Sequence, residues 1–210
     1  MRIISGSARG RRLLSPKHQR IRPTADRVKE SLFNILSVLM GSFTGCRVLD
    51  IFAGTGNLGI EALSRGAAQA VFVDSHKESA DLVVKNLRLL GFTDRSRVLE
   101  SEALSTLQYL EKKETAFAVV FIDPPYRQGL AEQVLDYLAT SALIDDSSLV
   151  VAEFSAGEVF PTTFCSLREF DRRVYGDTAI AFFSLTEPVD TDGLFDLQLE
   201  TRNPKPETDS

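Results

Sequence analysis

Short apolar segments alternate with helical ones along most of the chain. The apolar segments lie at 48–51, 70–74, 97–100 and 117–122. Apolar residues at helical spacing occupy the intervals between them, and this alternation indicates βαβ units with parallel strands. The segment at 117–122 is apolar almost throughout, which is typical of a strand covered on both faces.

The last part of this pattern predicts a hairpin. After a helix near 129–140 and an apolar segment at 149–154, two β-rich segments at 167–175 and 178–185 flank the dipeptide Gly176-Asp177. Such a dipeptide between two strands is a strong signal for a two-residue turn. We therefore predict an α/β fold: a Rossmann-like, doubly wound, mostly parallel sheet of seven strands with a C-terminal antiparallel hairpin, preceded by a short basic N-terminal extension.

The two ends of the chain differ from this central domain. Residues 2–14 hold apolar pairs separated by Gly and Ser, which favours a small irregular β segment. Thr24 can serve as the N-cap of an amphipathic helix at 25–40. Beyond residue 186 the chain has seven acidic and two basic residues with three prolines, so we expect disorder there. The predicted parts are a basic extension at 1–24, a domain at 25–186 and an acidic tail at 187–210.

Composition limits the class of protein. With 210 residues, 43% of them hydrophobic, the chain is long enough for one principal core. No stretch approaches the roughly 18 apolar residues of a membrane span, and the basic N-terminus lacks the apolar run of a signal peptide, so we expect a cytoplasmic protein without membrane contact. Cys46, Cys165, His18 and His76 show no metal-ligand spacing, so we expect reduced thiols and no metal.

Positive charge is concentrated at the N-terminus. The first 30 residues carry nine basic and two acidic side chains, whereas the whole chain has a net charge of −5. Such an extension is typical of a phosphate-binding surface whose affinity depends on salt. The arginines expected to bind such phosphates are Arg9, Arg11, Arg12, Arg20 and Arg22. From charge alone, a solvated basic segment without a partner remains an alternative.

A glycine-rich segment follows the first predicted strand of the domain. Gly54, Gly56 and Gly59 fit G-x-G-x-x-G, a spacing that also serves NAD-binding enzymes. Asp50, at the end of that strand, would repel a pyrophosphate but attract a cation. S-adenosylmethionine carries an ammonium and a sulfonium and has no phosphate. Asp74 and Glu102, at or just past the ends of the next two strands, fit the same cofactor, although either carboxylate could instead cap a helix.

The segment Asp123-Pro124-Pro125-Tyr126 directly follows the apolar strand at 117–122. The amino nitrogen of a nucleic-acid base is a poor nucleophile because its lone pair is conjugated with the ring. A carboxylate and a proline carbonyl that accept its two N–H groups would make it more nucleophilic, and the prolines stiffen the loop that holds these acceptors. Tyr126 offers a ring for base stacking, worth about 1–3 kcal/mol. The target base must be flipped out or single-stranded.

Five segments together resemble one family. They lie at 22–24, 30–34, 50–56, 61–67 and 123–126 and read RPT, ESLFN, DIFAGTG, EALSRGA and DPPY. They look like the RsmD family of 16S rRNA guanine-N2 methyltransferases, and the likeness spans about residues 1–185. The resemblance implies class I methyl transfer from S-adenosylmethionine to a guanine N2 amino group of small-subunit rRNA. It also implies that the rRNA lies within an assembling small ribosomal subunit and that the enzyme is a monomer.

The resemblance also assigns site residues. The methyl-transfer residues it implies are Asp123, Pro124, Pro125 and Tyr126. The cofactor residues it implies are Asp50, Phe52, Ala53, Gly54, Thr55 and Gly56 for the methionine moiety, Asp74 with Ser75 for the ribose, Glu102 and Ala103 for the adenine, and Thr24, Arg27, Phe33 and Asn34 to close the site. Asp74, Glu102 and Tyr126 stand where the family usually has Glu, Asp and Phe.

Several rival functions share part of these features. A DNA amino-methyltransferase or a protein glutamine N5-methyltransferase uses the same D/N-P-P-Y chemistry. A NAD-dependent oxidoreductase shares the glycine spacing but leaves Asp50 and the two prolines unexplained. A non-catalytic RNA-binding module accounts for the basic extension alone. The chain lacks an obvious target-recognition domain of the kind DNA methyltransferases add, which favours RNA recognised by its shape.

Overall fold

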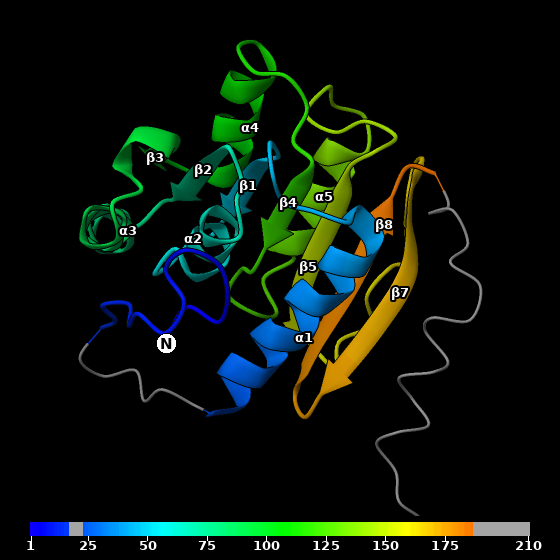
Figure 1. The fold of residues 1–210 in the computed structure, drawn as a ribbon. Coiled ribbons are helices and arrows are strands. Elements are labelled where there is room, and N and C mark those ends of the chain that lie inside the picture. Colours follow the sequence, from blue (N-terminus) through cyan, green and yellow to red (C-terminus); the bar gives the residue numbers. More distant parts are fainter. Residues whose placement is uncertain (17–22, 187–210) are drawn as a thin grey trace, which may run out of the picture.

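Eight strands form one sheet in the computed structural model, which describes residues 1–16 and 23–186 (Figure 1). The strands are β1 (Arg47–Ile51), β2 (Gln69–Asp74), β3 (Ser96–Glu100), β4 (Val119–Ile122), β5 (Leu149–Ser155), β6 (Thr163–Phe164), β7 (Leu167–Tyr175) and β8 (Thr178–Ser184). Their order in the sheet is β3-β2-β1-β4-β5-β8-β7-β6. The first five are parallel, and β8, β7 and β6 each pair antiparallel with a neighbour.

This topology confirms the predicted mostly parallel sheet with its C-terminal hairpin. The eighth strand, β6, is an addition to the predicted seven. It has only two residues, which is too short for an alternating pattern to be recognised in the sequence.

Helices cover both faces of the sheet (Figure 1). They are α1 (Pro23–Met40), α2 (Asn57–Ser64), α3 (Lys77–Leu90), α4 (Ala103–Glu111) and α5 (Leu130–Leu138), with a 3-10 turn, η1, at Thr93–Arg95. Helices α1, α2 and α3 pack on one face, and α4 and α5 pack on the other. Helix α1 begins at Pro23, two residues before the predicted start, because proline is favoured in the first turn of a helix.

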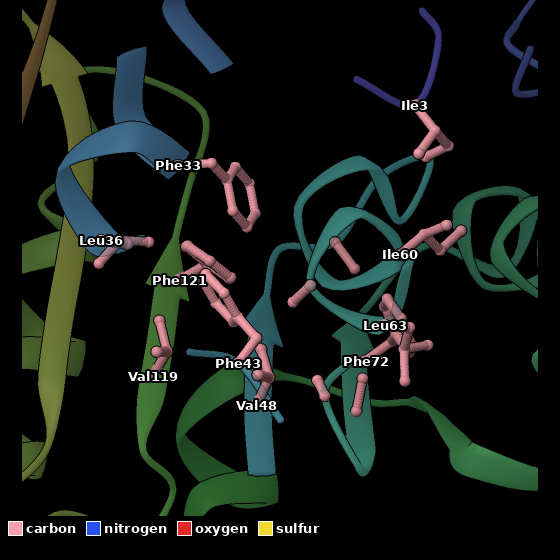
Figure 2. Close-up of a cluster of buried hydrophobic side chains, with 14 of the residues drawn as sticks. Ile3, Phe33, Leu36, Phe43, Val48, Ile60, Leu63, Phe72, Val119 and Phe121 are labelled. Atoms are coloured by element: carbon pink, nitrogen blue, oxygen red, sulfur yellow. The ribbon is translucent and has the colours of Figure 1, made fainter. Parts of the chain in front are cut away.

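The side chains on the two faces of each central strand belong to two separate hydrophobic clusters of the core. Val48 of β1 and Phe121 of β4 pack under α1 and α2, whereas Leu49 and Val120 pack under α4 and α5. Figure 2 shows the first cluster, in which Phe33 of α1 reaches toward Phe121. Because neighbouring strand positions point to opposite faces, a sheet covered on both sides needs apolar residues at consecutive positions.

The N-terminal segment, residues 1–16, is built into the domain. Arg2 and Arg12 form an antiparallel bridge, as expected for a small irregular β segment. Ile3, Ala8 and Leu13 are buried in the same cluster as α1 and α2, and Figure 2 shows Ile3 beside α2. The described part of the predicted basic extension therefore packs on the domain through these three buried side chains.

A buried carboxylate holds this segment in place. The side chain of Glu61 in α2 has no exposed surface and accepts the backbone N–H groups of Ile4 and Ser5 at 2.8 and 2.9 Å. It also pairs with Lys29 of α1 at 3.1 Å and with Arg65 at 3.0 Å. The Lys29 side chain is only 2% exposed.

Among the described residues, no helix is both long enough and apolar enough to cross a membrane.

Gly6 and Gly10 form a matched pair for testing how the N-terminal segment docks. Both have φ near +80°, but a Cβ at Gly6 would lie 1.8 Å from the Ser64 carbonyl oxygen, whereas a Cβ at Gly10 meets nothing within 4 Å. Gly10→Ala should lose about 1 kcal/mol of unfolding free energy through backbone strain alone. Gly6→Ala should lose a further 1–3 kcal/mol, roughly, from the clash. Urea unfolding of both variants checks this; equal losses would contradict the docking.

Glu61→Gln tests the buried carboxylate. The substitution leaves the Lys29 ammonium buried without a counter-charge, so unfolding free energy should fall by about 3–5 kcal/mol. Asp81→Asn is the control, because its partner Lys77 is 71% exposed and an exposed pair contributes about 0–1 kcal/mol. Thermal and urea unfolding should separate the two; similar small losses would show that Glu61 is dispensable.

Candidate active site at the carboxyl edge of the sheet

Four acidic residues meet where the parallel strands end. Asp50 lies in β1 and Asp74 ends β2, while Asp123 follows β4 and Glu153 lies in β5. Because parallel strands have their carboxyl ends at one edge, these side chains come from the same edge of the sheet. Strand β4 pairs with β1 on one side and β5 on the other, which places Asp123 between Asp50 and Glu153.

The predicted glycine-rich loop joins β1 to α2. Phe52 has a positive φ of 62°, which is uncommon for a residue other than glycine and is a mark of local backbone strain. Gly54 donates its N–H to Asp74 at 2.9 Å, and Gly59 donates to Asp50 at 2.8 Å. A Cβ at Gly59 would lie 2.4 Å from the Phe72 ring, so the third glycine allows α2 to pack closely on β2.

Asp50 is almost fully buried beneath this loop, with 2% of its surface exposed. Desolvation raises the pKa of its carboxyl, the Gly59 hydrogen bond lowers it and the nearby Asp74 charge raises it, and together they bring the pKa to about 7. A cationic group bound at this position would favour the ionised carboxylate. Thr55, Ala53 and Gly56 are also buried in the loop, whereas Phe52 and Gly54 are half-buried.

The next predicted cofactor residues lie along the same edge. The Asp74 carboxylate also accepts the N–H of His76 at 2.9 Å, and Ser75 is exposed beside it. Glu102 is exposed immediately before α4, and its side chain makes no cap hydrogen bond. Ala103 is half-buried at the start of α4.

Phe33 lies elsewhere than its predicted role requires. The ring has no exposed surface, because it packs against Phe43 at 5.4 Å and Phe121 at 5.6 Å, with the Arg65 guanidinium over its face. In this structure it is a core residue and cannot touch a cofactor. Asn34 is exposed on the same helix.

Other predicted residues lie on the surface or outside the described part of the chain. Arg27 is exposed on α1, and Arg9, Arg11 and Arg12 are exposed in the N-terminal segment. The Arg11 guanidinium also donates to the Leu89 carbonyl. Arg20, Arg22 and the Thr24 side chain lie outside the described residues.

The segment after β4 combines a stiff backbone with an anchored ring. Pro124 is buried, whereas Asp123, Pro125 and Tyr126 are exposed. The Tyr126 hydroxyl donates to Glu153 Oε1 at 2.6 Å and lies 3.2 Å from Thr178 Oγ1 of β8. Together with the start of α5, these residues line a surface pocket; its wall is made of Pro124, Pro125, Tyr126, Arg127, Gln128, Gly129, Leu130, Ala131, Glu132, Glu153, Phe154, Glu158 and Phe160.

The carboxyl groups at this end of the site resist ionisation. Desolvation, followed by the charges of Glu153 and Asp50, raises the pKa of Asp123 well above its usual range, although the residue as a whole is exposed. Desolvation also raises the pKa of Glu153, while the hydrogen bond from Tyr126 lowers it. The Asp123 and Glu153 carboxylates repel one another when both are charged, which favours protonation of one of them.

Sequence reasoning overlooked Glu153 and Thr178. Glu153 is the one charged residue in the strand LVVAEFS of β5. A lone acid in an apolar parallel strand, at the edge where the other acidic residues end, is a usable signal. Thr178 has no comparable signal, because only the antiparallel pairing of β8 with β5 brings it close. Among the described residues, no group of three or more His, Cys, Asp or Glu is arranged to hold a metal ion.

Known proteins resemble the chain over most of its length. The model of the family described as Conserved hypothetical protein 95 matches residues 1–184. Ribosomal RNA small subunit methyltransferase D of Escherichia coli strain K12 is 36% identical over 87% of this chain and 89% of its own. The solved structure of the Escherichia coli protein yhhF is also 36% identical, with a TM-score of 0.76 over 88% of this chain and 97% of that chain.

A more distant structure shares the fold alone. SMU.776, solved in complex with SAH, is 15% identical with a TM-score of 0.59, covering 78% of this chain and 50% of its own. The family match and the 36% identity confirm the resemblance seen in the five sequence segments. The chain therefore belongs to the Conserved hypothetical protein 95 family, which includes the RsmD methyltransferases.

Proposed function

We propose that this chain transfers a methyl group from S-adenosylmethionine to the exocyclic N2 amino group of a guanine in 16S rRNA, acting as a cytoplasmic monomer on an assembling small ribosomal subunit. One observation carries the proposal: the glycine-rich loop after β1 and the Asp123–Tyr126 segment after β4 lie on paired neighbouring strands. A methyl donor and an amino acceptor held at these two places would be adjacent.

The residues around the glycine-rich loop fit this cofactor. S-adenosylmethionine supplies, when bound, a methyl group on a positively charged sulfur. The buried Asp50 carboxylate, whose pKa is raised to about 7, would be stabilised by the ammonium of the methionine moiety. Asp74 would serve the ribose and the Glu102-Ala103 pair the adenine. The name of the SAH complex of SMU.776 supports a cofactor of this class for the fold.

The Asp123–Tyr126 segment would prepare the acceptor. The Asp123 carboxylate and the Pro124 carbonyl would each accept one N–H of the amino group, which localises the nitrogen lone pair. Tyr126, 38% exposed, would stack on the flipped base. With the amino nitrogen held in line with the donated methyl carbon, the N–C bond would form as the C–S bond breaks, the sulfur would keep that electron pair, and the Asp123 carboxylate would take the proton that the nitrogen loses, so that positioning accounts for most of the rate.

The RNA assignment rests on the N-terminal arginines and on the relatives. Arg9, Arg11 and Arg12 are exposed on a segment that is fixed beside α2 and α3. The name of the 36% identical Escherichia coli relative supports small-subunit rRNA as the substrate. DNA and glutamine acceptors share the Asp-Pro-Pro-Tyr chemistry. The protein is incubated with radiolabelled methyl donor and, separately, with immature small subunits, DNA and protein fractions. The fraction that gains label identifies the acceptor. Transfer to no fraction would show that the chain is not this enzyme.

Asp123→Ala should abolish methyl transfer to immature small subunits while leaving cofactor affinity nearly unchanged. Removal of one preorganised acceptor costs a factor of about 10² to 10³ in kcat. Calorimetric titration of S-adenosylmethionine is the second readout. A large loss of cofactor affinity would instead place Asp123 in the cofactor site.

Replacing Arg9, Arg11 and Arg12 together by Ala should weaken RNA binding and flatten its salt dependence. Each lost phosphate contact lowers the slope of log K against log salt by about 0.7 to 0.9. Substitution is preferable to deleting the segment, because Ile3 and Leu13 are core residues. Arg168→Ala, an exposed arginine of β7, is the control. An unchanged slope in the triple variant would remove the segment from the RNA interface.

A further inference from the structure

Glu153 stands next to Asp123 and has one unused oxygen. Strands β4 and β5 are in register with Ile122 opposite Ala152, so Asp123 and Glu153 are the next facing positions. Glu153 Oε1 accepts the Tyr126 hydroxyl at 2.6 Å. Its second oxygen, Oε2, makes no hydrogen bond to any residue that the structure describes.

This arrangement calls for a ligand with adjacent hydrogen-bond donors. The Asp123 and Glu153 carboxylates sit close enough for their charges to interact, and desolvation raises the pKa of each. A bound N–H group at each carboxylate would stabilise both ionised forms. Tyr126 donates to only one of the four oxygens of the two carboxylates. A base would therefore be recognised best if two neighbouring atoms on its edge both carry hydrogen.

Guanine is the only common base with an exocyclic amino group that has a ring N–H beside it. The ring nitrogens next to the amino groups of adenine N6 and cytosine N4 are acceptors. The guanine N2 amino group lies next to N1, which carries hydrogen. An enzyme that extrudes its target reads this edge through hydrogen bonds. A second carboxylate beside Asp123 would attract guanine and repel the ring lone pairs of the other two bases.

We propose that Glu153 selects guanine, with its Oε2 accepting the N1–H while Asp123 accepts an N–H of the neighbouring N2 amino group. This inference rests on the proposed methylation of a base amino group. It assigns Glu153 two contacts, since Oε1 holds the Tyr126 ring that stacks on the same base. The selection of guanine then comes from Glu153, near the carboxyl end of β5.

Glu153→Gln tests the selection with little change of shape. The amide oxygen still accepts the Tyr126 hydroxyl, but the amide nitrogen now points a donor at the guanine N1–H. The kcat/KM for immature small subunits should fall about tenfold or more, as expected when two donors face each other without an acceptor. Affinity for S-adenosylmethionine and the unfolding midpoint should stay near those of the wild type.

A second glutamate–tyrosine pair supplies the matched control. Glu111 of α4 accepts the Tyr137 hydroxyl at 2.5 Å, away from the carboxyl edge where Glu153 lies. Glu111→Gln makes the same chemical change in a similar hydrogen bond. It should leave methyl transfer unchanged, so a defect confined to Glu153→Gln is specific to the site.

A base analogue tests whether Glu153→Gln changes the preferred base as well as lowering kcat/KM for guanine. 2,6-Diaminopurine keeps the 2-amino group of guanine but has an unprotonated N1, which accepts a hydrogen bond. The methylated position is mapped first, and a small-subunit RNA is then ligated to carry 2,6-diaminopurine at that position. This RNA should be a poor substrate for the wild type. Glu153→Gln should prefer this RNA to the guanine RNA, because its amide donates to N1.

The outcomes separate the inference from the function on which it rests. If the wild type methylates no guanine in immature subunits, the proposed function fails. If the wild type methylates guanine and Glu153→Gln does so equally well, guanine selection by Glu153 is wrong. Tyr126→Phe, which removes only the hydroxyl, should be milder than Glu153→Gln. An equal defect in both variants, with unchanged base preference, would show that Glu153 acts only by holding Tyr126, and would overturn the proposal.

Discussion

The Glu61 carboxylate is the contact on which the placement of the N-terminal segment depends. A fully buried carboxylate is costly unless donors surround it, and here two backbone N–H groups, Lys29 and Arg65 all point at it. These donors come from the N-terminal segment, α1 and Arg65, the residue that follows α2. The charge can therefore be accommodated only when all three are in place, which makes their packing cooperative.

The same contacts continue to the glycine-rich loop. Lys29 also donates to the Asn57 side chain at the start of α2, at 2.7 Å. Asn86 of α3, fully buried, bonds both backbone groups of Leu14 and donates to the Thr55 carbonyl at 2.9 Å. The N-terminal segment and the candidate cofactor loop thus share buried hydrogen-bond partners. Exposed arginines on the segment are held at a fixed position relative to that loop.

The sequence was sufficient for features with a local signature. Alternating apolar segments predicted the order of parallel strands, and Gly176-Asp177 predicted the hairpin between β7 and β8. Asp50 and Asp123 were recognised because each directly follows apolar residues of a strand. These features depend on neighbours in the chain, where periodicity and turn chemistry are informative.

Features that depend on long-range packing were missed. Nothing local in residues 1–16 shows that Glu61 and Ser64, more than 50 positions away, will bind them. The positive charge of this segment indicated a phosphate-binding surface, while its few apolar residues, Ile3, Ala8 and Leu13, decide its burial. Phe33 was assigned to the cofactor by resemblance, yet an apolar helix face also predicts a core position, which is where the ring lies.

The carboxyl edge has a charge distribution that determines what it can bind. Asp50, Asp123 and Glu153 are desolvated acids from three adjacent strands, and each has a raised pKa. An anionic ligand would increase their repulsion, so phosphate groups are disfavoured at this edge, whereas the arginines of the N-terminal segment suit them. A nucleic acid can satisfy both surfaces if its backbone lies on the arginines and only a base, rich in N–H donors, enters the acidic site. The separation of charge between these two surfaces therefore favours a single extruded base as the group that reaches Asp123.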